Sequence, residues 1–186
     1  MKWFHNILSI GLVATSVAAA PLTSRQESNG GLDLFKLKLT SPNADLDGKY
    51  LAMNGETLGI FEGDDTSPVR VYQTDSSKEG LKELHTYPVG IVDHSLGLKG
   101  PPGLMTFVDM VSPGSADPGD GQIVAYDTFR MTEGKVTNNG DGQWLAFPGQ
   151  DQSWQVKWSD GTSVITTDYM VVEIAYEDAG EGRYNE

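Results

Sequence analysis

The chain contains no cysteine among its 186 residues. A disulfide framework, a thiol nucleophile and a cysteine-ligated zinc site are therefore excluded. Histidine is also scarce: besides His5, only His85 and His94 are present, and no HExxH or i, i+4 spacing organises them. We therefore predict no metal site and no cofactor, and we expect His85 and His94 to be surface side chains.

Positive charge is the second deficit. Thirteen lysines and arginines face 26 aspartates and glutamates, which gives a formal net charge of −13. Repulsion from phosphate makes nucleic acid an unfavourable partner, and an anionic membrane is unfavourable for the same reason. The acidity is typical of a protein that stays soluble in an acidic medium or wall.

Long hydrophobic runs are absent apart from one of about eleven residues, Ile7 to Val17. This run follows the positively charged Lys2 and ends in the small residues Val17-Ala18-Ala19. It is too short to span a bilayer, and its flanks are typical of a secretory signal. We predict a secreted protein that is extracellular or held at a cell wall, with no membrane partner.

The remaining composition divides the chain into four segments. A polar, small-residue stretch follows the signal, and the end of the chain is acidic and glycine-bearing. The predicted organisation is a signal peptide over 1–19, a flexible leader over 20–32, a single β domain over 33–176 and a disordered acidic tail over 177–186.

No stretch after residue 20 sustains the 3.6-residue apolar period of a helix. Instead Phe35, Leu37 and Leu39 alternate with lysines, which is the period-two pattern of a half-buried strand. The 22 glycines and 9 prolines suit many short strands joined by tight turns. We therefore predict an all-β protein.

An internal repeat organises these strands. Leucine, then a small residue, a large apolar residue, any residue and glycine recur from Leu51, Leu96 and Leu145. A second apolar cluster follows each copy after a turn, as expected for a strand pair. We interpret the chain as a β-trefoil-like barrel of three degenerate units, with an irregular β-sandwich as the alternative. A closed sheet hides its edges, which suits a monomer.

Two motifs carry the residue types of a catalytic or metal site. Asp93-His94-Ser95 contains those of a hydrolase triad, but successive strand residues point to opposite faces, and no Gly-x-Ser-x-Gly elbow is present. Asn43-x-Asp45-x-Asp47-Gly48 resembles the opening of a calcium loop, yet Asn54 stands where the bidentate acid belongs. We predict a turn there and no catalytic residue.

The tryptophans are the best candidates for ligand contact, because an exposed indole stacks on the apolar face of a sugar. Trp144 lies beside a turn that contains Asn139 and Asp141, and these three form the candidate ligand site. Trp154 and Trp158 share strand parity with Val156, so we expect both in the core. The Gln-x-Trp triplet at Gln152–Trp154 is that of ricin-type trefoil lectins, in which this tryptophan is largely a core residue.

Three short motifs, Gly48–Leu51, Gln143–Phe147 and Trp154–Trp158, carry a family resemblance. Between about Leu34 and Tyr176 the chain resembles small secreted fungal cell-wall proteins of the PhiA, or phialide-development, type. The resemblance implies a non-enzymatic wall protein linked to spore-forming structures, with wall polysaccharide as partner. The alternatives are a lectin-like carbohydrate-binding module, a secreted hydrolase, and a protease inhibitor that uses the loop from Ser112 to Gly121.

Overall fold

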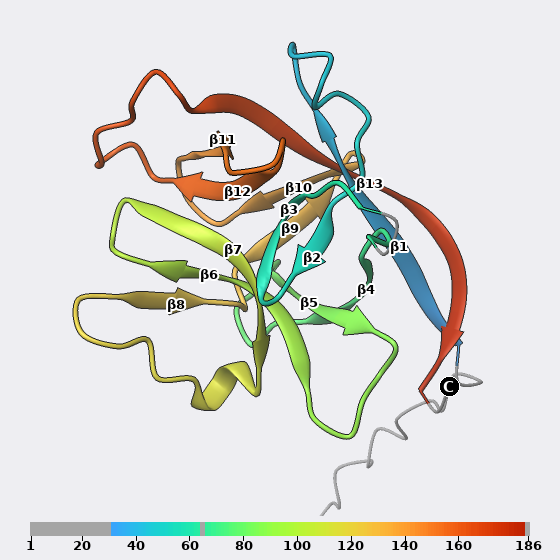
Figure 1. The fold of residues 1–186 in the computed structure, drawn as a ribbon. Helices are drawn as coiled ribbons and strands as arrows, with labels where there is room; N and C mark the ends of the chain where they lie inside the picture. The colour runs from blue at the N-terminus through green and yellow to red at the C-terminus, as the bar shows by residue number, and fades with distance from the viewer. Residues whose placement is uncertain (1–30, 64–65, 185–186) are drawn as a thin grey trace, which may run out of the picture.

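The computed structural model describes residues 31–63 and 66–184, and in these segments nearly all regular structure is β-strand (Figure 1). The predicted signal peptide and most of the predicted leader lie outside the described residues. A single short 3-10 helix, η1 (Pro113–Ser115), is the only helical element within the described segments. None of the described residues forms a helix with the length and apolar character needed to cross a membrane.

The described residues form thirteen strands, and most of the turns between them contain glycine. In chain order they are β1 (Gly31–Thr40), β2 (Ala52–Asn54), β3 (Thr57–Ile60), β4 (Arg70–Asp75), β5 (Lys82–Tyr87), β6 (His94–Gly100), β7 (Leu104–Val111), β8 (Ile123–Ala125), β9 (Phe129–Thr132), β10 (Lys135–Asn138), β11 (Gln143–Pro148), β12 (Trp154–Ser159) and β13 (Met170–Arg183).

Antiparallel pairing closes these strands into a barrel. A nine-stranded ring runs β1-β4-β5-β6-β7-β3-β12-β11-β13 and returns to β1. A shorter ring, β1-β4-β5-β9-β10-β13, closes through the same contact between β13 and β1. The predicted all-β barrel is therefore confirmed, and the alternative, an irregular β-sandwich, does not describe this closed sheet.

Each copy of the sequence repeat is a β-hairpin. The hairpins are β2–β3, β6–β7 and β11–β12, and the repeat leucines Leu51, Leu96 and Leu145 are all buried. Asn54-Gly55 makes the first turn, with Gly55 at φ 60°, a conformation that glycine adopts without steric cost.

The return strands of the three hairpins pair with one another in a cycle. The start of β3 pairs with the middle of β7, the start of β7 with the end of β12, and the start of β12 with the end of β3. The pairs are Thr57 with Val108, Met105 with Trp158, and Trp154 with Ile60. The three hairpins thus meet around one point, although they lie far apart in the sequence.

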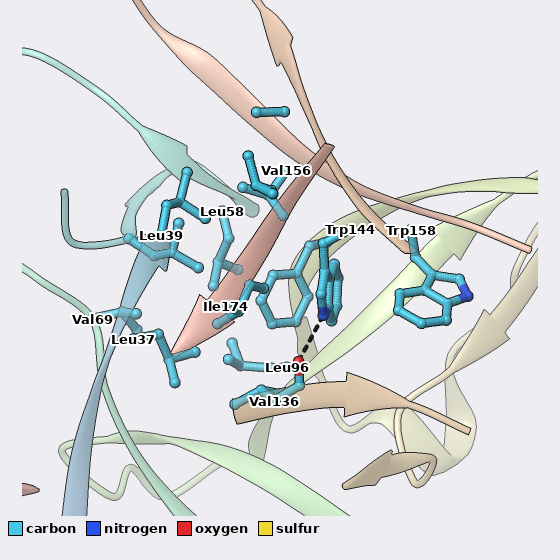
Figure 2. Packing of buried hydrophobic residues seen from close by; sticks show 14 of the residues in the cluster. Leu37, Leu39, Leu58, Val69, Leu96, Val136, Trp144, Val156, Trp158 and Ile174 are labelled. Carbon is cyan, nitrogen blue, oxygen red and sulfur yellow. Dashed lines mark hydrogen bonds between the residues drawn. The ribbon is translucent and has the colours of Figure 1, made fainter. Parts of the chain in front are cut away.

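The interior of the barrel holds one large apolar cluster. The alternation predicted in β1 places Leu37 and Leu39 inside, where both are fully buried. Figure 2 shows them on one side of the cluster, with the indoles of Trp144 and Trp158 on the other. A core of this size stabilises the fold without disulfides.

The disordered tail predicted over 177–186 is wrong for residues 177–183, because β13 continues to Arg183. Residues of β13 up to Arg183 pair with β1 back to Gly31, so the predicted leader also ends earlier than expected. A second apolar cluster explains the pairing: Leu32 and Leu34 are buried with Tyr72, and Ala179 packs against them. The sequence suggested disorder because the acidic residues lie on the outer face, where Lys38 donates to Glu177 at 2.8 Å.

Among residues 178–182, we expect the backbone amides of Asp178, Glu181 and Gly182 that point toward β1 to exchange slowly with deuterated solvent, because these residues pair with β1 on either side of a bulge. Hydrogen exchange followed by mass spectrometry or NMR measures this directly. The loop over 160–169, which lies outside the strands, provides the internal comparison. Exchange of the Asp178, Glu181 and Gly182 amides at the rate of an unstructured peptide would contradict the pairing.

Candidate functional site

The burial of Trp144 argues against the ligand site predicted at Trp144, Asp141 and Asn139, which needed an exposed indole. Trp144 is only 3% exposed, and its indole nitrogen donates to the carbonyl of Val136 at 2.7 Å (Figure 2). Asn139 and Asp141 lie in the exposed turn before β11, and Asn139 accepts a hydrogen bond from Arg130. The indole therefore lies in the core, and only its edge lines a small hollow of about 190 Å³ beside Val136 and Trp158.

Trp154, which the sequence placed in the core, is instead half-buried at an end of the barrel. It is the first residue of β12 and lies opposite Pro148, the last residue of β11. Its side chain packs on the core and also lines a hollow of about 370 Å³. Ala44, Ile60 and Pro148 complete the apolar part of the lining.

The turn between β11 and β12 holds Trp154 and its polar neighbours in place. Asp151 and Gln152 adopt the left-handed conformation, with φ of 53° and 58°. The turn is closed by hydrogen bonds from the Gly149 amide to the Ser153 carbonyl and from the Ser153 hydroxyl to Gln150. Strained, hydrogen-bonded turns are often found at ligand sites. Gln152 and Ser153 both line the hollow.

A second loop, between β1 and β2, forms the opposite wall. The side-chain oxygen of Asn43 accepts a hydrogen bond from the backbone amide of Asp45 at 2.9 Å, and a carboxylate oxygen of Asp47 accepts one from the amide of Ser41 at 3.1 Å. These side-chain oxygens build the turn that the sequence predicted. Across residues 31–63 and 66–184 there is no group of three or more histidine, aspartate or glutamate side chains arranged to hold a metal ion.

Three charged side chains complete the hollow. Asp45 and Glu62 carry carboxylates and Lys49 carries an ammonium group, and all three are exposed. In the described part of the chain, none of the three forms an ion pair with another protein side chain. The site thus combines an indole, an amide, a hydroxyl and unpaired charges around a shallow space.

His85 is not the surface residue that the sequence predicted. It is 7% exposed and stacks on Tyr72 with ring centroids 5.1 Å apart. One ring nitrogen contacts Asp93 at 2.8 Å and the other contacts Thr74 at 3.0 Å. Both nitrogens are occupied, so this histidine braces the loop between β5 and β6. Nearby, burial raises the pKa of the Glu83 carboxyl.

His94 makes a separate contact, 2.7 Å from its Nδ1 to Asp109. Asp109 also accepts a hydrogen bond from Thr86 at 3.2 Å. Asp93, His94 and Ser95 therefore reach three different partners, because Ser95 donates to the carbonyl of Leu84. The sequence argument that these neighbours do not converge is confirmed.

Comparison of the chain with protein-family models, with curated proteins and with solved structures gives no match.

Proposed function

We propose that this protein is a non-enzymatic, secreted carbohydrate-binding protein of a cell wall or cell surface, and that the hollow at Trp154 is its ligand site. The observation that carries the proposal is the half-buried indole of Trp154 beside Gln152 and Ser153. An indole face packs on the C–H groups of a sugar ring, while amide and hydroxyl groups hydrogen-bond its hydroxyls.

The rigidity of the hollow supports binding. Its two principal loops are fixed by their own hydrogen bonds, so little conformational entropy is lost when a ligand enters. Its volume of about 370 Å³ is within the range of small-molecule sites, which suits one or two sugar rings of a longer chain.

The sequence supports an extracellular location. Its signal-like first residues, its acidity and its resemblance to fungal wall proteins of the PhiA type agree with a role at the wall. Wall polysaccharide is the natural partner under this proposal, and a link to sporulation structures follows from the resemblance alone.

We also infer that the barrel is a β-trefoil of three units. Two features support this architecture: the short ring β1-β4-β5-β9-β10-β13, which takes a pair of strands from each third of the chain, and the cyclic pairing of β3, β7 and β12. The three hairpins that repeat in the sequence then cap one barrel.

Replacing Trp154 with alanine is expected to weaken binding to immobilised wall polysaccharide about tenfold or more, because the stacking surface is removed. Trp154→Phe should retain part of the affinity. Affinity electrophoresis or a glycan array measures the change. The matched control is Tyr184→Ala, which removes an aromatic side chain that is 51% exposed and does not line this hollow.

Thermal unfolding of each variant separates lost binding from lost folding. Unchanged binding by a folded Trp154→Ala variant would move the ligand site elsewhere. Failure of the wild-type protein to bind any glycan would overturn the proposed function.

A further inference from the structure

We propose that the ligand of the Trp154 hollow is a polymer of amino sugars whose amines are free and protonated. This inference rests on the proposed function and specifies its ligand. The two carboxylates of the hollow, on Asp45 and Glu62, would bind the ammonium groups while Trp154 packs on a ring.

The balance of charge in the hollow carries the argument. Asp45 and Glu62 come from different loops, and both are exposed and outside any ion pair in the described segments. Lys49 offsets one of them, and Asp151, in the same turn as Gln152, adds another exposed carboxylate beside the site. A cationic sugar gains charge-assisted hydrogen bonds from these groups that a neutral sugar does not.

The whole molecule favours the same ligand. A formal net charge of −13 attracts a polycation and raises its association rate, and the effect weakens as salt is added. An anionic polysaccharide would meet repulsion both from the protein as a whole and from the hollow itself. Acetylation of the amines removes the charge but leaves the sugar rings, so it isolates the electrostatic contribution.

The test compares three oligosaccharides of equal length in titration calorimetry at mildly acidic pH. They are a glucosamine oligomer with free amines, its N-acetylated counterpart and a neutral glucose oligomer. We expect the free-amine oligomer to bind about tenfold more tightly than the other two, and its advantage to fall when salt is raised.

The double variant Asp45→Asn/Glu62→Gln should lower affinity for the free-amine oligomer to that of the acetylated one. Lys49→Gln should raise the affinity for the free-amine oligomer, because it removes a positive charge from the hollow. The matched control is Asp141→Asn, which removes an exposed carboxylate from the turn at the other end of β11 and should change affinity little. Circular dichroism confirms that each variant is folded.

Equal affinity of the wild-type protein for all three oligomers would overturn this inference and leave sugar binding intact. An equal loss of affinity in Asp45→Asn/Glu62→Gln and in the control Asp141→Asn would also overturn it, because the attraction would then come from the overall charge of the protein. No binding of any oligomer would instead count against the proposed function, and loss of all binding in Trp154→Ala would support it.

Discussion

Replacing Trp144 with alanine is expected to lower the free energy of unfolding by about 3–5 kcal/mol, as is usual for a large aromatic residue removed from a core. The indole is 3% exposed and its ring centroid lies 5.0 Å from that of Phe107 and 5.1 Å from that of Trp158. The substitution opens a cavity among these rings and removes the hydrogen bond from the indole to the Val136 carbonyl. Urea unfolding followed by circular dichroism measures the loss.

Two further variants test the cause. Trp144→Phe keeps much of the packing but removes the indole N–H, so its effect should be smaller than that of alanine. Val164→Ala alters a side chain that is 91% exposed and should change stability by no more than about 0.5 kcal/mol. A loss below about 1 kcal/mol for Trp144→Ala would show that the indole is not a core residue.

Gly59→Ala is expected to destabilise the protein by about 1–3 kcal/mol and also to weaken glycan binding. A Cβ atom at this position would lie 2.1 Å from the carbonyl oxygen of Trp154, so β3 and β12 must separate. The pairing they share, between Ile60 and Trp154, fixes the indole at the hollow. Urea unfolding and a glycan titration on the same sample measure both effects.

Gly90→Ala is the matched control for this substitution. A Cβ atom at Gly90 would have its nearest neighbour, the Val92 carbonyl oxygen, at 3.4 Å, and the residue has no positive φ. We expect little change in either stability or binding. Similar losses in the two variants would show that the close approach of β3 and β12 does not decide the result at Gly59.

The hairpins could be predicted from the sequence because their signals are local. Alternating apolar residues and turn dipeptides such as Asn54-Gly55 specify strand pairs without information from elsewhere in the chain. The recurrence of the same pattern from Leu51, Leu96 and Leu145 indicated that three such pairs share one barrel.

The exposure of the tryptophans could not be predicted in the same way. Strand parity places Trp154, Val156 and Trp158 on one face, and all three do point inward. Strand alternation does not indicate how far along the barrel each residue lies. Trp154 is the first residue of β12, at an end of the barrel, and is therefore only half-buried. Trp144 lies near a turn in sequence but is covered by Phe107 from another hairpin, a contact that only the fold creates.

The partners of the histidines and the pairing of the last strand are equally non-local. Asp109 lies 15 residues from His94, and Glu177 lies 139 residues from Lys38. No spacing rule links residues so far apart, so an acidic end of the chain looked like a solvated tail. Val172, Ile174 and Tyr176 stand at alternate positions, which is typical of a strand, but this local pattern does not give the length of β13.

The position of β13 has a consequence for the order in which the protein can fold. This strand pairs with β1, β10 and β11 and supplies the contact that closes both rings. A chain still emerging from the ribosome can form its hairpins but leaves the edges of β1 and β11 open until the residues of β13 become available. Contacts between residues so far apart in sequence form slowly, so we expect the pairing of β1 with β13 to be the last step of folding.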